Sequence, residues 1–497
     1  MPETRKITFN GIHEDTGSYL IPPLTPAELA MAAFGKPEED DEDHRADLET
    51  RKTKGEGDLG VKAGVVAENL ASAGWGVIFA AGTPPEVVEA LEPLLEQRKK
   101  DAGKLFRRCD GAESYQHKNG RGESKPLFLR SRNAATSGDV DPVKMPYYLL
   151  LVGSPEEIPF TFQYQLDVQY AVGRIHFDKP EEYFNYAQSV VASENGKLNL
   201  PNRAVFFGPA NPNDDSTARS SQHLISPLAQ LAAKRKDAPA WTIDKLLPEQ
   251  STRARLARLL GGDDTPGFLF TASHGMGGYK LDDPRIFSST GALTCQDWGG
   301  PGSTGRVRDT FFAAEDLSSD AKLAGLIAMV FACYGGGCPE FNNFFLQDGF
   351  SKADRIAPKP FLSALPKRML SHPKGGALAV IAHVDRVWDC SFLNVEQQQR
   401  ELATFESMLK LLLEGKPVGL ALERLNTRYA EIASDLATEM QIANELQEPQ
   451  NKEVFAELWT STNDARNYMV LGDPAVRLRL GEAPADPRVV EMPKFGE

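Results

Sequence analysis

The sequence lacks any run of about 18 apolar residues, the length that a helix needs to cross a membrane. Its five cysteines are an odd number with no Cys-x-x-Cys pair, which argues against a disulfide framework or a zinc site. The formal net charge of −14 argues against sequence-independent nucleic-acid binding as the main role. The first residues also lack the apolar core of a signal peptide, so we expect a cytoplasmic protein without membrane partners.

Two short apolar runs, in contrast, end in residues that can carry chemistry. The run 268–272 leads into His274-Gly275, and the run 326–332 leads into Cys333 and a series of glycines. Short apolar runs that stop at glycine are typical of strands buried on both faces. Because ligands collect at the carboxyl ends of such strands in open α/β sheets, we expect both reactive side chains at one edge.

This pairing favours a cysteine nucleophile with a histidine base. An imidazole that takes the thiol proton creates the attacking thiolate. The backbone N–H groups of Gly275 and Cys333 are the candidates for an oxyanion hole, and glycine lets a substrate approach bare backbone. The alternative is that Cys333 is a small core residue and His274 a turn residue. No third residue that orients His274 can be named.

The two motifs resemble the caspase-like cysteine peptidases, which include caspases, gingipains, clostripain, separase and CHAT-domain proteins. Only part of the caspase signature Gln-Ala-Cys-x-Gly is present, because Phe331 stands where that signature has Gln. The gingipain and CHAT branch is the more similar one. Further motifs that resemble it are Leu-Leu-Leu-Val-Gly at 149–153, Ile-Pro at 158–159, Leu-Asp-Val-Gln-Tyr at 166–170, Val-Gly-Arg-Ile at 172–175 and the Gly-Asp-Pro segment at 471–478.

The resemblance implies an α/β fold, a caspase-like, mostly parallel sheet flanked by helices, built as a tandem of an inactive and an active unit. Residues 37–47 and 51–55 are too charged to pack and predict a linker. The expected parts are an N-terminal segment and charged linker (1–60), a first, non-catalytic subdomain that contributes to S1 (61–200), a catalytic subdomain (201–480) and a tail (481–497). Residues 101–146 are basic and weakly periodic, which predicts a long exposed loop.

The gingipain pattern also implies a specificity. Its Asp lies at the base of the S1 pocket, and Asp167 occupies that place here. A buried carboxylate selects a guanidinium, so we expect cleavage after Arg and less well after Lys. Asp385 and Trp388 are further candidate wall residues for S1. A pocket that used Arg386 or Arg174 would instead prefer an acidic residue at P1. The alternative to an S1 role for Asp167 is that it is an ordinary loop or salt-bridge residue.

The resemblance further implies protein or peptide substrates and activation by a protease or a CRISPR-type effector, in a bacterial defence or cell-death pathway. Arg306 and Arg308, in the glycine-rich stretch 297–309 between the two motifs, are candidate self-cleavage sites. No cofactor is expected. Some relatives bind calcium, for which the acidic pairs 214–215 and 282–283 are candidates, although solvated turns explain them equally.

Two other functions remain open from the sequence. The chain could be a caspase-like pseudoenzyme or partner-binding module in which His274 and Cys333 do no chemistry. It could also use the same dyad for acyl transfer or another thiol reaction. The complete pair with its following glycines favours the peptidase.

Overall fold

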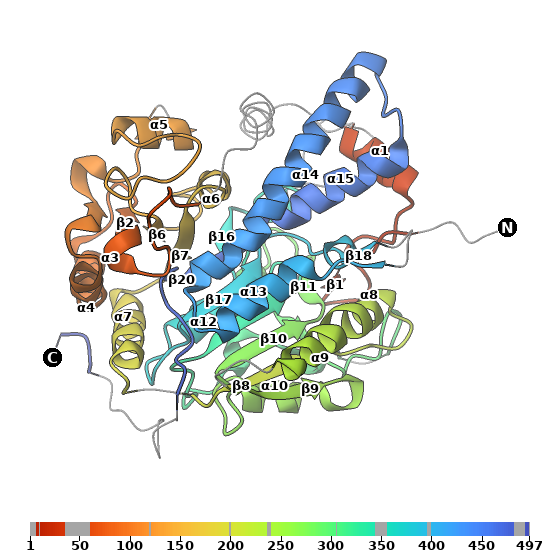
Figure 1. Ribbon diagram of the computed structural model, residues 1–497. Helices are drawn as coiled ribbons and strands as arrows, with labels where there is room; N and C mark the ends of the chain where they lie inside the picture. Colours follow the sequence, from red (N-terminus) through yellow and green to blue (C-terminus); the bar gives the residue numbers. More distant parts are fainter. Residues whose placement is uncertain are drawn as a thin grey trace.

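The computed structural model describes residues 6–8, 10–34, 60–118, 121–197, 200–235, 240–304, 306–342, 355–394, 399–481 and 493–496. The predicted linker stretches 37–47 and 51–55 lie outside the described residues, as does most of the predicted tail. A ten-stranded sheet runs through the middle of the molecule, with helices packed against it (Figure 1). The predicted α/β class, with a mostly parallel sheet flanked by helices, is confirmed.

The large sheet consists of two parallel sets of strands that run in opposite directions. In spatial order the strands are β3 (Phe106–Cys109), β2 (Trp75–Phe79), β6 (Tyr148–Val152), β7 (Ala171–Ile175), β20 (Tyr468–Gly472), β17 (Ala379–His383), β14 (Ile327–Phe331), β10 (Phe268–Ala272), β8 (Arg203–Phe207) and β9 (Thr242–Leu246). All neighbours are parallel except β20 and β17. The amino end of β7 therefore lies at the same edge of the sheet as the carboxyl ends of β17, β14 and β10.

Two of the glycine motifs meet between β7 and β20, next to the place where the two sets of strands join. Gly173 of β7 lies against the end of β20, and a Cβ atom on it would come within 2.1 Å of the Gly472 carbonyl oxygen. No side chain fits such a gap, so this close backbone approach requires glycine. The Gly-Arg and Gly-Asp-Pro segments are thus packed against each other, although they are far apart in sequence.

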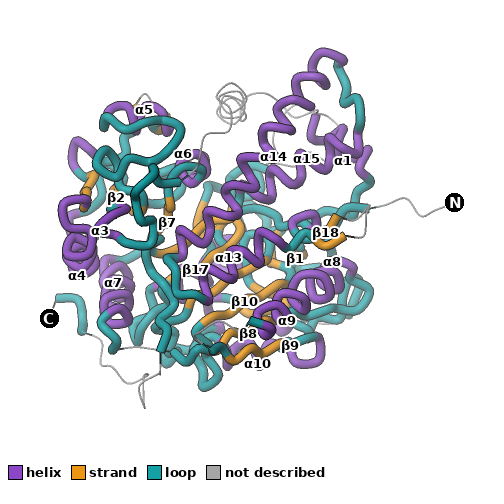
Figure 2. Tube along the Cα trace, viewed as in Figure 1, coloured by secondary structure: helices purple, strands orange, loops and turns teal. Residues whose placement is uncertain are grey.

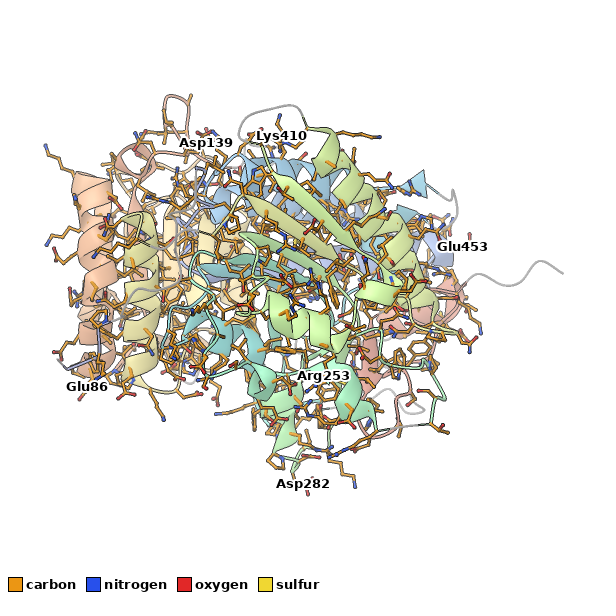
Figure 3. All side chains as sticks on the ribbon, turned by 90° about the horizontal axis from the view of Figure 1, so that it is seen from below. Glu86, Asp139, Arg253, Asp282, Lys410 and Glu453 are labelled. Atoms are coloured by element: carbon orange, nitrogen blue, oxygen red, sulfur yellow. The ribbon has the colours of Figure 1, made fainter. Side chains whose placement is uncertain are left out.

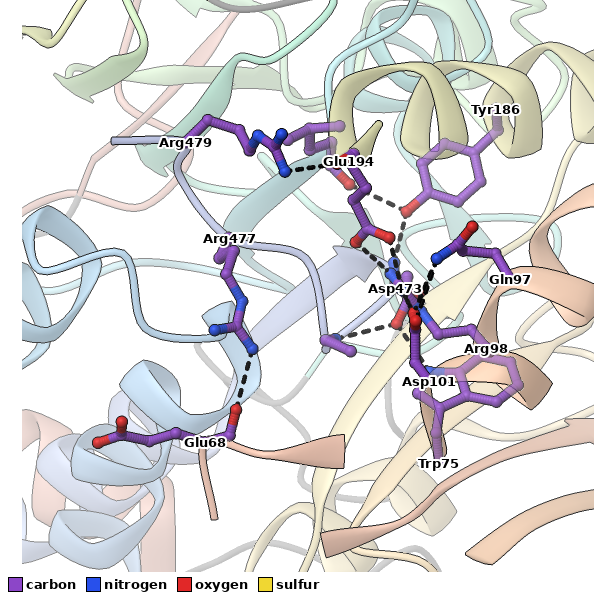
Figure 4. A network of polar contacts seen from close by, with 12 residues as sticks. Glu68, Trp75, Gln97, Arg98, Asp101, Tyr186, Glu194, Asp473, Arg477 and Arg479 are labelled. Atoms are coloured by element: carbon purple, nitrogen blue, oxygen red, sulfur yellow. Dashed lines mark hydrogen bonds and ion pairs between the residues drawn. The ribbon is translucent and has the colours of Figure 1, made fainter. Parts of the chain in front are cut away.

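A buried ion network holds the same junction (Figure 4). Arg98 of α4, which is 1% exposed, donates to Asp473 at 2.6 Å and pairs with Glu194 of α7 at 2.7 Å. The indole of Trp75 donates to the other oxygen of Asp473 at 2.9 Å. Burial lowers the pKa of Arg98, but the carboxylates of Asp473 and Glu194 have the larger effect and hold it well above the usual range. The network ties the carboxyl end of β20 to both helices.

Helices surround the sheet on both faces and at its ends (Figure 2). They are α1 (Pro26–Phe34), α3 (Leu70–Ala73), α4 (Pro85–Ala102), α5 (Lys125–Ser131), α6 (Phe160–Asp167), α7 (Pro180–Glu194), α8 (Asp215–Arg219), α9 (Ser226–Lys234), α10 (Arg253–Leu259), α11 (Arg285–Ser289), α12 (Ala364–Leu370), α13 (Ala403–Leu413), α14 (Val418–Leu446) and α15 (Lys452–Arg466). Pro417 is the N-cap residue of α14. The predicted long loop over 101–146 is wrong, because β3 and α5 lie in it and Phe128 and Leu129 are buried.

A small second sheet brings the N-terminal segment into the molecule. It contains β1 (Gly11–His13), β11 (Gly275–Gly277), β12 (Leu293–Thr294) and β13 (Phe311–Phe312), in that order. Strand β1 pairs in parallel with β11, so that Gly11 lies opposite Gly275. Two-stranded pairs join β15 (Gly337–Cys338) to β16 (Phe361–Leu362), β18 (Leu393–Asn394) to β19 (Gln399–Arg400), and β4 (His117–Lys118) to β5 (Arg121–Gly122).

Charged side chains cover the periphery, as the composition requires. Glu86, Asp282 and Glu453 are exposed and point outward at the margins of the molecule (Figure 3). Within the described residues, no helix combines the length and apolar character that a membrane span needs.

Candidate functional site

The ends of β10 and β14 place His274 and Cys333 beside each other along the edge of the sheet. Their register pairs Ala272 with Phe331, and the Ser273 amide extends the ladder by donating to the Phe331 carbonyl at 3.1 Å. His274 and Cys333 follow at matching positions. The backbones are so close that a Cβ atom on Gly275 would lie 1.8 Å from the Cys333 carbonyl oxygen. Glycine after the histidine is therefore a steric requirement of this approach.

Asp214 orients the imidazole of His274. Its carboxylate accepts a hydrogen bond from Nε2 at 2.8 Å, and both side chains are fully buried. Burial alone would raise the pKa of Asp214, but the adjacent imidazole and the hydroxyl groups of Thr217 and Tyr19 lower it to about 2. The carboxylate is thus ionised and fixes the proton on Nε2. The other nitrogen, Nδ1, is buried without a hydrogen-bond partner and is left as the basic nitrogen.

Two aromatic rings enclose the imidazole. The Tyr19 ring lies 5.9 Å from that of His274, and the Trp298 ring meets it edge-on at 5.3 Å. The Tyr19 hydroxyl also donates to Asp214 at 2.7 Å. These contacts exclude water from the His274–Asp214 pair and hold its geometry.

Cys333 is fully buried and is a neutral thiol in this state. Burial raises its pKa to about 12, although the Val387 amide, which donates to Sγ at 3.2 Å, and the positive charge of Arg386 oppose the shift. A thiol with this pKa supplies almost no thiolate at neutral pH. The Cys333 thiol would need contact with solvent or a change of surroundings to become reactive.

The two amides expected to form an oxyanion hole do converge on one point. The N–H groups of Gly275 and Cys333 both donate to the backbone carbonyl of Asn10, each at 3.2 Å. The arrangement is the one that an oxyanion requires, with two donors aimed at a single oxygen atom. In this structure, that oxygen belongs to the N-terminal segment of the same chain.

The predicted S1 residues lie in different surroundings. Asp385 has a left-handed backbone with φ of 78°, and its carbonyl accepts the Tyr334 amide at 2.7 Å, so it borders Cys333. Its carboxylate is already engaged by the amide and guanidinium of Arg386, at 2.9 and 3.3 Å. Trp388 packs in a hydrophobic cluster with Ile7, Leu24 and Trp459.

Asp167 ends α6, next to the amino end of β7 and on the same edge of the sheet as Cys333. Strands β7 and β14 are three positions apart, which corresponds to roughly 14 Å. Neither carboxylate oxygen makes a hydrogen bond of good geometry. Burial raises the pKa of Asp167 well above its usual range, although the nearby Gln163 side chain and Val172 amide oppose the shift. Arg174 is also buried, and it is satisfied by Gln163 and by backbone carbonyls.

The remaining candidates are the expected self-cleavage arginines and the acidic pairs. Arg308 is engaged by Glu315 and Asp316, whereas Arg306 is exposed. Asp283 pairs with Arg285 at 2.7 Å, and Asp214 is engaged by His274. The described part of the chain contains no group of three or more His, Cys, Asp or Glu side chains that could hold a metal ion.

Sequence reasoning missed Asp214 and the N-terminal contacts. Asp214 caps α8 by accepting the Thr217 amide and lies shortly after β8, the strand next to β10. The position of Asp214 beyond a strand end was the available signal, but the acidic pair 214–215 is equally typical of a solvated turn. Nothing in the sequence around Asn10 and Tyr19 indicates that they would reach the site.

Comparison with known proteins gives little further guidance. No family model matches the chain, and no curated protein matches it. A solved structure named "Structure of Protease" is similar over 81% of this chain and 78% of that chain, with 14% identity and a TM-score of 0.47. The function of the chain has to be inferred from the geometry of its own site.

Proposed function

We propose that the protein is a cysteine endopeptidase in which Cys333 is the nucleophile, His274 the general base and Asp214 the residue that orients His274. The observation that carries this proposal is the convergence of the Gly275 and Cys333 amides on one carbonyl oxygen next to a buried Asp–His pair. A core cysteine and a turn histidine would need neither the oriented imidazole nor the paired donors.

The chemistry follows from these positions. His274 Nδ1 accepts the proton of Cys333, and the thiolate attacks the substrate carbonyl carbon to form a carbon–sulfur bond. The two amides stabilise the oxyanion. Collapse of this intermediate breaks the peptide carbon–nitrogen bond, and the imidazolium gives its proton to the leaving amine. Water then hydrolyses the thioester, which releases the acid product and restores the thiol.

For specificity, we propose a preference for Arg over Lys at P1, with Asp167 as the partner of the substrate charge. A buried carboxylate that makes no hydrogen bond of good geometry supports this, because an incoming guanidinium would satisfy it and restore its ionised form. Asp385 is less suited to the task, since Arg386 already neutralises it.

The test is hydrolysis of a fluorogenic peptide panel that varies only at P1. The wild type should be compared with Cys333→Ala and with the matched control Cys109→Ala, whose buried thiol lies at the far edge of the sheet. We expect activity on Arg peptides that Cys333→Ala abolishes and Cys109→Ala retains. Activity that survives in Cys333→Ala would refute the proposal.

A further inference from the structure

The N-terminal segment crosses the site in the manner of a peptide substrate. The Asn10 amide donates to the Val387 carbonyl at 3.1 Å, and the Asp389 amide donates to the Thr8 carbonyl at 3.4 Å. These alternating bonds join Asn10 to Val387 and Thr8 to Asp389 in the pattern of a short antiparallel ladder. Extended peptides bind to exposed backbone edges in this way.

The peptide bond between Asn10 and Gly11 lies at the nucleophile. The Asn10 carbonyl oxygen accepts both proposed oxyanion-hole amides. On the other side of the bond, a Cβ atom on Gly11 would lie 3.4 Å from Cys333 Sγ. The chain then continues as β1 along β11. Asn10 therefore holds the position of a P1 residue, and Gly11 that of the residue after a scissile bond.

Several contacts anchor this segment after it leaves the cleft. The Tyr19 hydroxyl donates to Asp214, so the hairpin that follows β1 covers the Asp–His pair directly. Arg285 reaches Glu14 at 3.2 Å and Asp15 at 2.8 Å, which clamps the hairpin turn to the body of the protein. Ile7 and Leu24 form a β-bridge and pack in one cluster with α1 and α15.

The result is a site closed to solvent. Asn10 is 4% exposed, and His274 and Cys333 are 0% exposed. An external peptide would need the same Val387 and Asp389 backbone groups and the same two amide donors that Thr8 and Asn10 now use.

We propose that the segment containing Thr8, Asn10 and Gly11 is a substrate-like inhibitor built into the chain, with Asn10 in the S1 position, and that hydrolysis of other peptides requires this segment to leave. The proposal rests on the proposed peptidase function for its consequence, but the occlusion of Cys333 can be measured without any hydrolysis. Displacement would expose the thiol and vacate the oxyanion hole in one step.

The experiment measures alkylation of Cys333 by iodoacetamide in the full-length protein, by mass spectrometry, beside hydrolysis of the peptide panel. The test variant is Tyr19→Phe with Arg285→Ala, which removes the polar anchors at these two side chains. The control is Arg258→Ala, which breaks the ion pair of the exposed Arg258 with Asp264. We expect Cys333 alkylation to rise at least about tenfold in the test variant alone. A synthetic peptide of residues 6–14, added in excess, should reverse the rise competitively.

Cys109 reports on unfolding, since it is buried far from the site. If Cys109 is alkylated in parallel, Asn10→Pro takes the place of the double variant, because it removes the N–H bond to Val387 and leaves Tyr19 and Arg285 unchanged. Cys333 alkylation that is equally fast in the wild type, or unaffected by either variant, would overturn the occlusion. Faster alkylation without hydrolysis would uphold the occlusion and count against the peptidase proposal instead.

Discussion

Asp214 and His274 form a fully buried pair whose oxygen and nitrogen atoms are 2.8 Å apart, and the pair leaves Nδ1 of the imidazole unpartnered. In Asp214→Asn, the amide can no longer hold the proton on Nε2. We expect kcat to fall by about 10²–10⁴-fold with little change in KM, because the substitution removes the correct tautomer and not substrate contacts. Steady-state kinetics with the preferred peptide measure both constants. A fall in kcat of less than about threefold would rule out the orienting role.

The same pair predicts a pH dependence of stability. The folded state lowers the pKa of Asp214 to about 2, so its ionised form stabilises the fold above the unfolded value near 4. That contribution, about 2 kcal/mol, disappears as the pH falls from about 4 towards 2. Thermal melts of wild type and Asp214→Asn should differ most above pH 4 and converge at the acid end. A difference in melting temperature between the two proteins that does not change with pH would contradict this assignment.

Asp167 predicts a pH dependence of stability with the opposite sign. Burial raises the pKa of its carboxyl, so ionisation above the unfolded value near 4 favours the unfolded chain. Asp167→Asn should therefore stabilise the protein increasingly from pH 4 to pH 8, while it lowers selectivity for Arg over neutral P1 peptides by at least about tenfold. Asp141→Asn is the control, since Asp141 lies in an exposed pair with Lys62. Unchanged Arg selectivity would exclude Asp167 from S1.

The approach of Gly275 to Cys333 predicts a sharp steric penalty. In Gly275→Ala, the methyl group would lie 1.8 Å from the Cys333 carbonyl oxygen, and the backbone would have to move. We expect loss of activity and a destabilisation of more than about 2 kcal/mol in urea unfolding. Gly277→Ala, on the same strand, meets its nearest atom at 3.1 Å and should be much milder. Equal effects from the two variants would contradict the close approach.

The buried network at the sheet junction predicts a large loss of stability away from the site. Arg98→Met leaves the carboxylate of Asp473 buried and without its cation. We expect a cost of about 3–5 kcal/mol in denaturant unfolding, and unchanged kinetics for the folded fraction. Lys99→Met, one residue further on and exposed, should cost less than about 0.5 kcal/mol.

Local patterns were enough to predict the strands that carry His274 and Cys333 and the mostly parallel sheet, because apolar runs bounded by glycine report directly on buried strands. They could not predict that β20 joins two oppositely running sets, since strand direction depends on pairing partners far apart in sequence. The places of Asp214 and Asn10 in the site could not be predicted for the same reason. Each reaches the site through tertiary contacts that leave no periodic trace in its own segment.

The most direct test of a Cys333 peptidase is peptide hydrolysis by the unlocked variant, Tyr19→Phe with Arg285→Ala, with and without Cys333→Ala. The account predicts turnover of Arg peptides, faster than in the wild type, that Cys333→Ala abolishes. No turnover of any peptide by an unlocked protein whose Cys333 is readily alkylated would contradict it.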